Sequence, residues 1–139
     1  MSLDEHWVSE ICEDGGSAFS LRQTGKCFDR QSDFQRVEVY DTETYGKLMM
    51  IDGCTMVSSR ENFLYHEMIA HPVMFIHPAP KDVAIIGGGD CGTLREVLKH
   101  PSVRRAVQID IDKTVTEAAT QHFPELCTAN DDPRAAFLF

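Results

Sequence analysis

The sequence is poor in basic residues, in long apolar runs and in paired cysteines, and each shortage excludes a class of protein. The 13 Lys and Arg against 22 Asp and Glu give a net charge of -9, which disfavours a nucleic-acid partner. No apolar run approaches the roughly 20 residues of a membrane span. The 5 cysteines are odd in number and include no C-x-x-C pair. Neither a disulfide framework nor a metal site is therefore predicted.

The amino terminus also lacks a recognisable targeting signal. Residues 1–5 are acidic and do not form the basic and apolar regions of a signal peptide. Together with unpaired cysteines, this predicts a cytoplasmic protein. An acidic surface would attract a cationic small substrate, although acidity that serves solubility alone explains the net charge equally well.

The chain is organised around residues 82–92. A short, mostly β-branched apolar run at 83–86 predicts a buried central strand, and residues 93–98 predict a helix. The turn between them is rich in glycine: Gly87, Gly88, Gly89 and Gly92. Glycines let the backbone turn sharply and let a ligand lie against it, so this order is typical of a nucleotide-type site.

Two acids specify the ligand further. Asp110 ends a second predicted strand at 105–110, close to the ~20-residue offset at which an acid reaches ribose hydroxyls. Asp90 lies inside the glycine turn, where a carboxylate would repel a pyrophosphate and attract a sulfonium or an ammonium. This favours an adenosyl-sulfonium ligand over a dinucleotide. The alternative for Asp90 is a solvated turn residue.

The amino-terminal part predicts a small antiparallel sheet. Residues 17–22 and 34–40 are candidate strands, Thr24 and Gly25 a turn, and Asp52-Gly53 a two-residue hairpin turn. Val37 and Val39 alternate with polar residues, which indicates a half-buried strand. The Ser58 to Glu61 capping box predicts a helix that starts near residue 59. We therefore expect a β domain at 1–58 and a second domain at 59–139.

The second part predicts an α/β fold. After the glycine turn a helix should run to about residue 100, followed by the strand at 105–110, a helix at 113–122 and a strand at 135–139. This alternation is typical of a Rossmann-like, methyltransferase-type doubly wound parallel sheet. Three strands that end at an apolar edge bury little. We expect the chain to be the amino-terminal piece of a longer protein, or to need a partner.

A possible metal motif is excluded by its spacing. His66, Glu67 and His71 resemble a zinc-protease motif, but the histidines are five residues apart and point about 140° from each other on a helix. No metal ligand is therefore predicted. The plain alternative for His66 is a partly exposed helix residue.

The motifs together resemble the polyamine aminopropyltransferases, spermidine synthase above all. The resemblance covers nearly the whole chain, in order, and is carried by residues 7–10, 33–35, 46–53, 65–67, 85–90, 94–96 and 131–134. Cys91 departs from the family's usual glycine and would be strained if that position needs a positive φ. Asp110 stands where most members have a glutamate.

The resemblance implies transfer of an aminopropyl group from decarboxylated S-adenosylmethionine to putrescine, with release of methylthioadenosine and no separate cofactor. It implies nucleoside or donor binding by a set of residues spread over the chain: Gln35, His66, Gly87, Gly88, Gly89, Asp90 and Asp110. Tyr65 and Asp90 would contact the amine. The general-base aspartate is expected beyond Phe139, so the isolated chain should be inactive. A homodimer or homotetramer is expected.

Two other functions stay open at this point. An S-adenosylmethionine-dependent methyltransferase would share the fold and the ribose acid. A non-catalytic, truncated paralogue could bind nucleoside or a partner chain. Competition binding between the intact and the decarboxylated donor would separate the first of these from aminopropyl transfer. The acceptor amine is not specified by the sequence.

Overall fold

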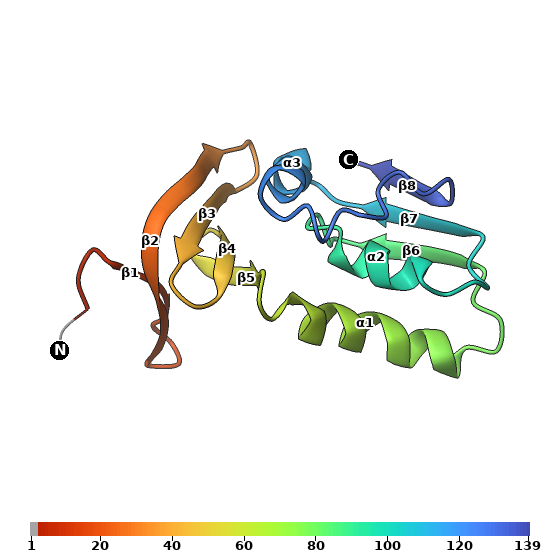
Figure 1. Ribbon diagram of the computed structural model, residues 1–139, viewed down its shortest axis with the longest axis horizontal. Coiled ribbons are helices and arrows are strands. Elements are labelled where there is room, and N and C mark those ends of the chain that lie inside the picture. The colour runs from red at the N-terminus through yellow and green to blue at the C-terminus, as the bar shows by residue number, and fades with distance from the viewer. Residues whose placement is uncertain (1–2) are drawn as a thin grey trace. The chain divides into compact units, whose positions relative to one another are not determined.

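The computed structural model describes residues 3–139, whose chain course is drawn in Figure 1. The chain forms two compact units, Met1–Glu61 and Asn62–Phe139. Within residues 3–139, no helix combines the length and the apolar character that crossing a bilayer requires.

The first unit is an antiparallel sheet, as predicted. Its strands, as described within residues 3–61, are β1 (Trp7–Cys12), β2 (Ser17–Gln31), β3 (Arg36–Thr42), β4 (Gly46–Ile51) and β5 (Cys54–Ser58). They pair in sequence order. The backbone N–H of Thr55 on β5 donates to Oε2 of Glu10 on β1 at 3.0 Å. The two edge strands therefore approach each other, and the sheet curls into a half-barrel.

The curl buries both faces of the central strands. Leu48 and Met50 on one side of β4, and Met49 on the other, are all at most 2% exposed. Burial on β3 also exceeds the half-buried pattern that was predicted. Glu38 is only 8% exposed, and its carboxylate accepts Lys26 Nζ at 2.5 Å and the Tyr40 hydroxyl at 2.9 Å. The ion pair offsets the cost of removing this charge from water.

Local turn signals were right at one place in this unit and wrong at another. The predicted hairpin turn is present, with Asp52 and Gly53 at φ values of 49° and 80°. The predicted turn at Thr24 and Gly25 is wrong, because β2 continues through it to Gln31. A register shift between Gln23 and Gly25 absorbs the irregularity. Glycine thus marks a β-bulge here and not a chain reversal.

The second unit alternates helices and strands, as expected for an α/β fold. Its elements are α1 (Asn62–Ile76), β6 (Asp82–Ile86), α2 (Gly92–Leu98), β7 (Arg105–Ile109), α3 (Lys113–His122) and β8 (Ala135–Leu138). Figure 1 shows β6, β7 and β8 side by side, in a parallel sheet of that order. Their ends lie within one or two residues of the predicted ones.

One face of this sheet carries the core of the second unit. Ile85 on β6 and Ala106 on β7 pack against apolar residues of α1 and α2, among them Ala70, Met74, Leu94 and Val97. On α1 the buried side chains recur every four residues: Asn62, His66, Ala70 and Met74. This spacing puts them on a single helix face. The helix packs on the core with that face.

The start of α1 differs from the prediction. The helix begins at Asn62 and not near residue 59. The Ser58 hydroxyl does accept the backbone N–H of Glu61, at 3.3 Å, as in a capping box. This bond closes a turn over residues 58–61 instead of the first turn of the helix. Ser58 is still the last residue of β5, which is why the helix starts later.

Candidate functional site

The turn after β6 has the backbone geometry that its glycines predicted. Gly87 and Gly88 have φ values of 80° and 77°, which side chains other than glycine rarely allow. The N–H of Gly87 donates to the carbonyl of Ile109 at 2.7 Å, and Cys91 N–H donates to the carbonyl of Gly88 at 2.8 Å. The glycine loop, residues 87–92, is thus tied to the end of β7.

Gly89 brings the loop against Asp110. A Cβ atom on Gly89 would lie 2.9 Å from Oδ2 of Asp110 and 2.9 Å from the Val115 side chain. Only a residue without a side chain fits at this distance. Oδ1 of Asp110 accepts the N–H of Asp112 at 3.0 Å, which fixes the carboxylate at the end of β7. The predicted glycine loop and the predicted acid therefore lie against each other.

Asp90 is held by both of its oxygens. Oδ1 accepts the N–H of Gly92 at 2.9 Å, and Oδ2 lies 3.0 Å from Nε2 of His66 on α1. Because a carboxylate only accepts, Nε2 carries the proton. Asp90 retains a partly exposed side chain, 15% accessible. It can accept one more cationic group while the two internal bonds fix its direction.

His66 is not the partly exposed residue that the plain interpretation expected, because it is fully buried. Its ring lies over Gly92, where a Cβ atom would approach the ring to 2.2 Å. Within residues 3–139 its Nδ1 atom has no hydrogen-bond partner. His66 therefore supports Asp90 from behind. Direct contact between His66 and a ligand stays a prediction.

Cys91 adopts the strained conformation that the sequence made possible. It has a φ of 70° and precedes the first residue of α2. Such a left-handed conformation costs a residue with a Cβ atom roughly 1–2 kcal/mol. The buried thiol donates to the Gly89 carbonyl at 3.5 Å and lies 3.5 Å from Asn130 Nδ2. The side chain thus packs under the loop.

Cys91 also contacts a second thiol, Cys127, in the segment that follows α3. The pKa of Cys91 is raised, first by its hydrogen bond with Cys127 and then by burial. The same hydrogen bond lowers the pKa of Cys127. Cys127 therefore loses its proton more readily than Cys91 does.

Several residues that support the loop carried no sequence signal. The Thr116 hydroxyl on α3 donates to the Gly89 carbonyl at 2.9 Å. Asp112 caps α3 by accepting the N–H of Thr114 at 2.9 Å. Gln108 on β7, 1% exposed, lies beneath the loop with its Nε2 3.7 Å from Cys91 Sγ. These residues are of common types at positions without a motif, so only the three-dimensional structure shows that they support the loop.

A buried carboxylate anchors the helix that follows the loop. Glu96 on α2 is 0% exposed and accepts Arg95 Nε at 2.8 Å and Lys99 Nζ at 2.5 Å. Burial alone would raise the pKa of Glu96, but these two cations outweigh it and hold the pKa below its usual value. His71 Nε2 also approaches the carboxylate, at 3.1 Å. Glu96 therefore joins α2 to α1 through His71.

The two remaining predicted site residues are one on α1 and one in the first unit. Tyr65 on α1 is 61% exposed, and its ring meets the His66 ring edge-on at 5.4 Å. Gln35 belongs to the first unit and lies just before β3, where its backbone N–H donates to the Ser32 hydroxyl at 3.1 Å. Their roles in amine and nucleoside binding stay predictions.

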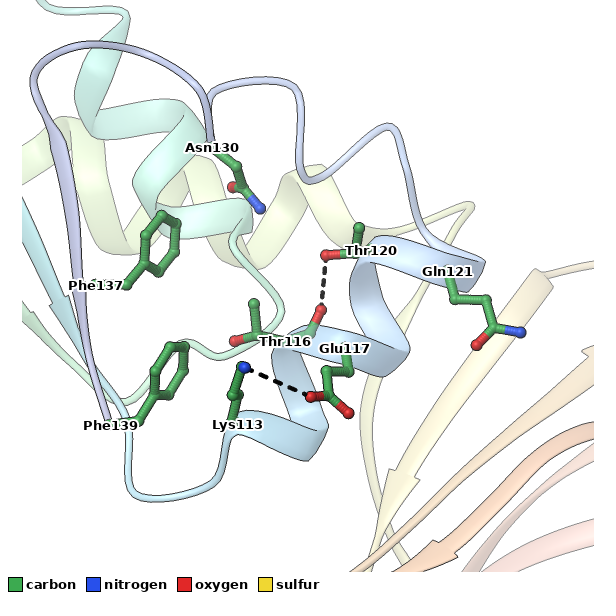
Figure 2. Close-up of a pocket in the computed structure, with 8 residues that line it drawn as sticks. All are labelled: Lys113, Thr116, Glu117, Thr120, Gln121, Asn130, Phe137 and Phe139. Carbon is green, nitrogen blue, oxygen red and sulfur yellow. Dashed lines mark hydrogen bonds and ion pairs between the residues drawn. The ribbon is translucent and has the colours of Figure 1, made fainter.

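A separate hollow of about 460 Å³ lies between α3 and β8. Figure 2 shows its lining, in which the rings of Phe137 and Phe139 stack with centroids 6.3 Å apart. Thr120 and Asn130 line the same hollow. None of its lining residues was predicted as a site residue.

The order of strand, glycine turn, helix and following acid is typical of a Rossmann-type nucleoside-binding fold. Comparison with known proteins agrees with this class. Residues 62–139 match the model of the spermine/spermidine synthase domain, and residues 6–58 match the spermidine synthase tetramerisation domain. The chain therefore belongs to the spermine/spermidine synthase family.

The curated relatives match this chain over nearly its full length. A polyamine aminopropyltransferase of Methylococcus capsulatus is 64% identical over 135 residues, which are 97% of this chain and 47% of the relative. One from Thioalkalivibrio sulfidiphilus is 59% identical over 139 residues, or 100% of this chain and 48% of the relative. This chain spans about half the length of these curated relatives.

Solved structures are similar over the same span. Spermidine synthase from Thermotoga maritima has a TM-score of 0.93 and 39% identity, and the match covers 100% of this chain and 49% of that one. A spermidine synthase in complex with the transition-state analogue AdoDATO has a TM-score of 0.94 at 39% identity, with 100% and 47% covered. The predicted fold class is confirmed.

Proposed function

We propose that this chain provides the donor-binding part of a polyamine aminopropyltransferase of the spermidine synthase type. The reaction would move an aminopropyl group from decarboxylated S-adenosylmethionine to putrescine and release methylthioadenosine. The relatives' names support this assignment, and so does the analogue in the complex of a structural neighbour.

The observation that carries the proposal is the close approach of Gly89 and Asp110. The carboxylate lies 2.9 Å from the position of a Cβ on Gly89. A ribose placed on the bare loop backbone would therefore meet an acid that accepts from both of its hydroxyls. Each such charged hydrogen bond contributes about 1.5–3 kcal/mol. We assign the nucleoside to Gly87, Gly88, Gly89 and Asp110.

Asp90 would bind the amine of the aminopropyl group. Its two internal hydrogen bonds fix the carboxylate, and His66 acts as a positioning residue through Asp90. Tyr65 would line the amine site, and Gln35 would contact the nucleoside. Transfer is an in-line displacement at the carbon beside the sulfonium, for which orientation alone can supply up to about 7–11 kcal/mol.

A general base must also keep the attacking amine neutral. We assign that role to an aspartate in the part of the relatives that this chain does not match. The 139-residue chain by itself would then bind methylthioadenosine without catalysing transfer. Release of methylthioadenosine by the purified chain from the two substrates would contradict this assignment.

Titration calorimetry with methylthioadenosine tests the donor site directly. The wild-type chain should bind, and Asp110→Asn should weaken binding at least 10-fold because a ribose acceptor loses its charge. Asp110→Glu should retain most of the affinity. Asp82→Asn is the matched control, since its side chain is 65% exposed on the same sheet. Equal affinities for all four folded proteins would remove Asp110 from the site.

A chimaera tests the reaction. Residues 1–139 would be joined to the unmatched half of the Methylococcus capsulatus relative. Methylthioadenosine release would be measured with the decarboxylated donor, and S-adenosylhomocysteine release with intact S-adenosylmethionine. Turnover with the decarboxylated donor supports the proposal. A folded chimaera that turns over intact S-adenosylmethionine instead would favour the methyltransferase. Binding without turnover of either donor would favour the non-catalytic paralogue.

We further propose that residues 6–58 form an oligomer interface, because they match a tetramerisation domain. We expect a homotetramer first and a homodimer second. We also expect the protein to be located in the cytoplasm. Light scattering after size exclusion should give a mass two or four times 15.6 kDa. A monomer at micromolar concentration would contradict this part of the proposal.

A further inference from the structure

Cys91 and Cys127 form a pair of facing thiols beside the glycine loop, and the proposed transfer reaction uses neither of them. Cys91 directly follows Asp90 and is fully buried, whereas Cys127 is partly exposed. Cys127 Sγ lies 4.0 Å from the main-chain oxygen of Asp90, the residue before Cys91. Each thiol also shifts the pKa of the other. The fold thus brings the two sulfur atoms near each other from distant parts of the sequence.

Polar groups surround the pair on several sides. Asn130 Nδ2 lies 3.5 Å and Gln108 Nε2 3.7 Å from Cys91 Sγ. The Thr120 hydroxyl lies 3.9 Å from Cys127 Sγ. Donors aimed at sulfur favour the thiolate, which is the reactive form. The pKa of Cys127 is lowered by its interaction with Cys91, whereas the pKa of Cys91 is raised, so Cys127 is the more readily ionised thiol of the pair.

A small molecule has a route to these sulfurs. Thr120 and Asn130, which contact the two thiols, also line the hollow between α3 and β8 that Figure 2 shows. Hydrogen peroxide is small and uncharged and fits in a space of about 460 Å³. Thiolates that are partly exposed and lie next to a second cysteine are the ones that such oxidants attack.

We propose that Cys91 and Cys127 are a redox pair that closes to a reversible disulfide on exposure to hydrogen peroxide. In the first step the Cys127 thiolate attacks one peroxide oxygen. The S–O bond forms, the O–O bond breaks, and the leaving hydroxide takes a proton to become water. Cys127 is then a sulfenic acid.

In the second step the Cys91 sulfur attacks the Cys127 sulfur. The S–S bond forms, the S–O bond breaks, and the hydroxide leaves as water with the proton of Cys91. Two thiols have lost two electrons, and one peroxide has become two waters. The negative charge of Cys127, which raised the pKa of Cys91, is absent at this stage, so Cys91 can give up its proton.

The fold allows the two sulfurs to close to the roughly 2.05 Å of a disulfide. Cys127 lies in the irregular segment between α3 and β8, outside any helix or strand. Such segments move at lower cost than paired strands. The new bond would tie the glycine loop covalently to that segment.

Disulfide mapping tests the proposal on the purified 139-residue chain. The reduced protein is treated with a small molar excess of hydrogen peroxide, alkylated and digested without reductant for mass spectrometry. Two of the 5 thiols should be lost to a peptide pair linked through Cys91 and Cys127, and dithiothreitol should restore both. Oxidation of Cys127 to sulfinic acid without a link, or a link to another cysteine, would overturn the proposal.

Matched variants complete the test. Cys91→Gly suits the φ of 70° and should leave Cys127 as a sulfenic acid that dimedone traps. Cys54→Ser, at an exposed cysteine, should form the link as the wild type does. If Cys91→Gly loses two thiols like the wild type, the pair is wrongly assigned. Should Cys91→Gly fail to fold, Cys127→Ser must abolish the link instead. The oxidation assay contains no transferase substrate, so its outcome is independent of the proposed transferase function.

Discussion

Nε2 of His66 lies 3.0 Å from Oδ2 of Asp90, and the same imidazole ring occupies the space above Gly92. Asp90 in turn accepts the Gly92 N–H at 2.9 Å. Helix α1, the loop carboxylate and the first residue of α2 therefore form a closed three-part contact. A substitution in any one of the three should therefore alter the packing of the other two.

Gly92→Ala should destabilise the chain because its new methyl group overlaps the His66 ring. We expect a loss of roughly 2 kcal/mol, within the range for overpacking. In a His66→Ala background the same substitution should cost at least about 1 kcal/mol less, a coupling typical of contacting residues. Urea unfolding of the four proteins measures this difference.

Gly25→Ala is the control for that series, because nothing lies within 4 Å of a Cβ at Gly25. It should change stability by no more than about 0.5–1 kcal/mol, the usual glycine-to-alanine difference. Additive effects of His66→Ala and Gly92→Ala would show that the ring does not fill the space over Gly92.

Cys91→Gly should be more stable than Cys91→Ala by about 1 kcal/mol. Both variants lose the thiol and its contacts, so they differ mainly in the cost of the left-handed φ of 70°. Thermal unfolding under reducing conditions should place the glycine variant a few degrees higher. A higher melting temperature for the alanine variant would mean that the backbone relaxes out of this conformation.

The chain should lose stability as the pH falls through 6.5 because of His100. Burial first, and then the charge of His71, lower the pKa of His100 below its ordinary 6.5, against an opposing effect of Glu96. The unfolded chain thus takes up this proton at higher pH than the folded one. The stabilisation that comes from the neutral His100 ring is fully present above pH 6.5 and is lost as the pH falls below it. Melting temperatures measured from pH 7.5 to 5.5 should fall.

His100→Gln should flatten that pH dependence, since it removes the titrating ring. His77→Gln serves as its control at an exposed histidine, whose ring accepts the Ala79 N–H at 3.1 Å. Glutamine can accept the same bond. An equal fall of the melting temperature in the wild type and in His100→Gln would assign the effect to another group.

Arg134→Ala should destabilise the second unit by about 1–3 kcal/mol. The guanidinium donates to the carbonyl of Leu98 at 2.8 Å and to that of Val103 at 3.3 Å, both beyond or at the end of α2. Its ion pair also lowers the pKa of Asp132 to about 2. Removing the donor leaves part-buried acceptors unpaired. Chemical unfolding gives the size of the loss.

Arg104→Ala is the comparison for Arg134. Arg104 is 69% exposed and pairs with Asp82, at 3.3 Å, on the surface. Exposed ion pairs contribute little, so the change should stay below about 1 kcal/mol. A loss as large as that of Arg134→Ala would indicate that general charge balance, and not the carbonyl contacts, stabilises this region.

The features that the sequence predicted correctly are those set by neighbouring residues. The Asp52-Gly53 turn and the glycine loop after β6 depend on the φ preferences of individual residue types, which can be read directly from the sequence. Asp110 was expected beside the loop because its distance along the chain from the loop is fixed by the intervening helix and strand. The ends of β6, α2, β7, α3 and β8 followed to within one or two residues for the same reason.

The features that were missed depend on contacts between distant residues. His66 looked like a partly exposed helix residue, yet it is buried against Asp90 and Gly92. Thr116 and Cys127 carry no motif, and their positions under the loop follow from how α3 packs. Gly25 marked a bulge instead of a turn because its partner strand continues past it. Local patterns do not contain this information.

The face of the parallel sheet opposite its core has a practical consequence. Ile86, Ile109 and Leu138 stand side by side across β6, β7 and β8 and are 88%, 38% and 56% exposed. Sulfate and similar salts strengthen the tendency of such surface to leave water. The chain should therefore salt out early and bind phenyl resins firmly. Ile86→Lys, which changes the most exposed of the three, should elute sooner.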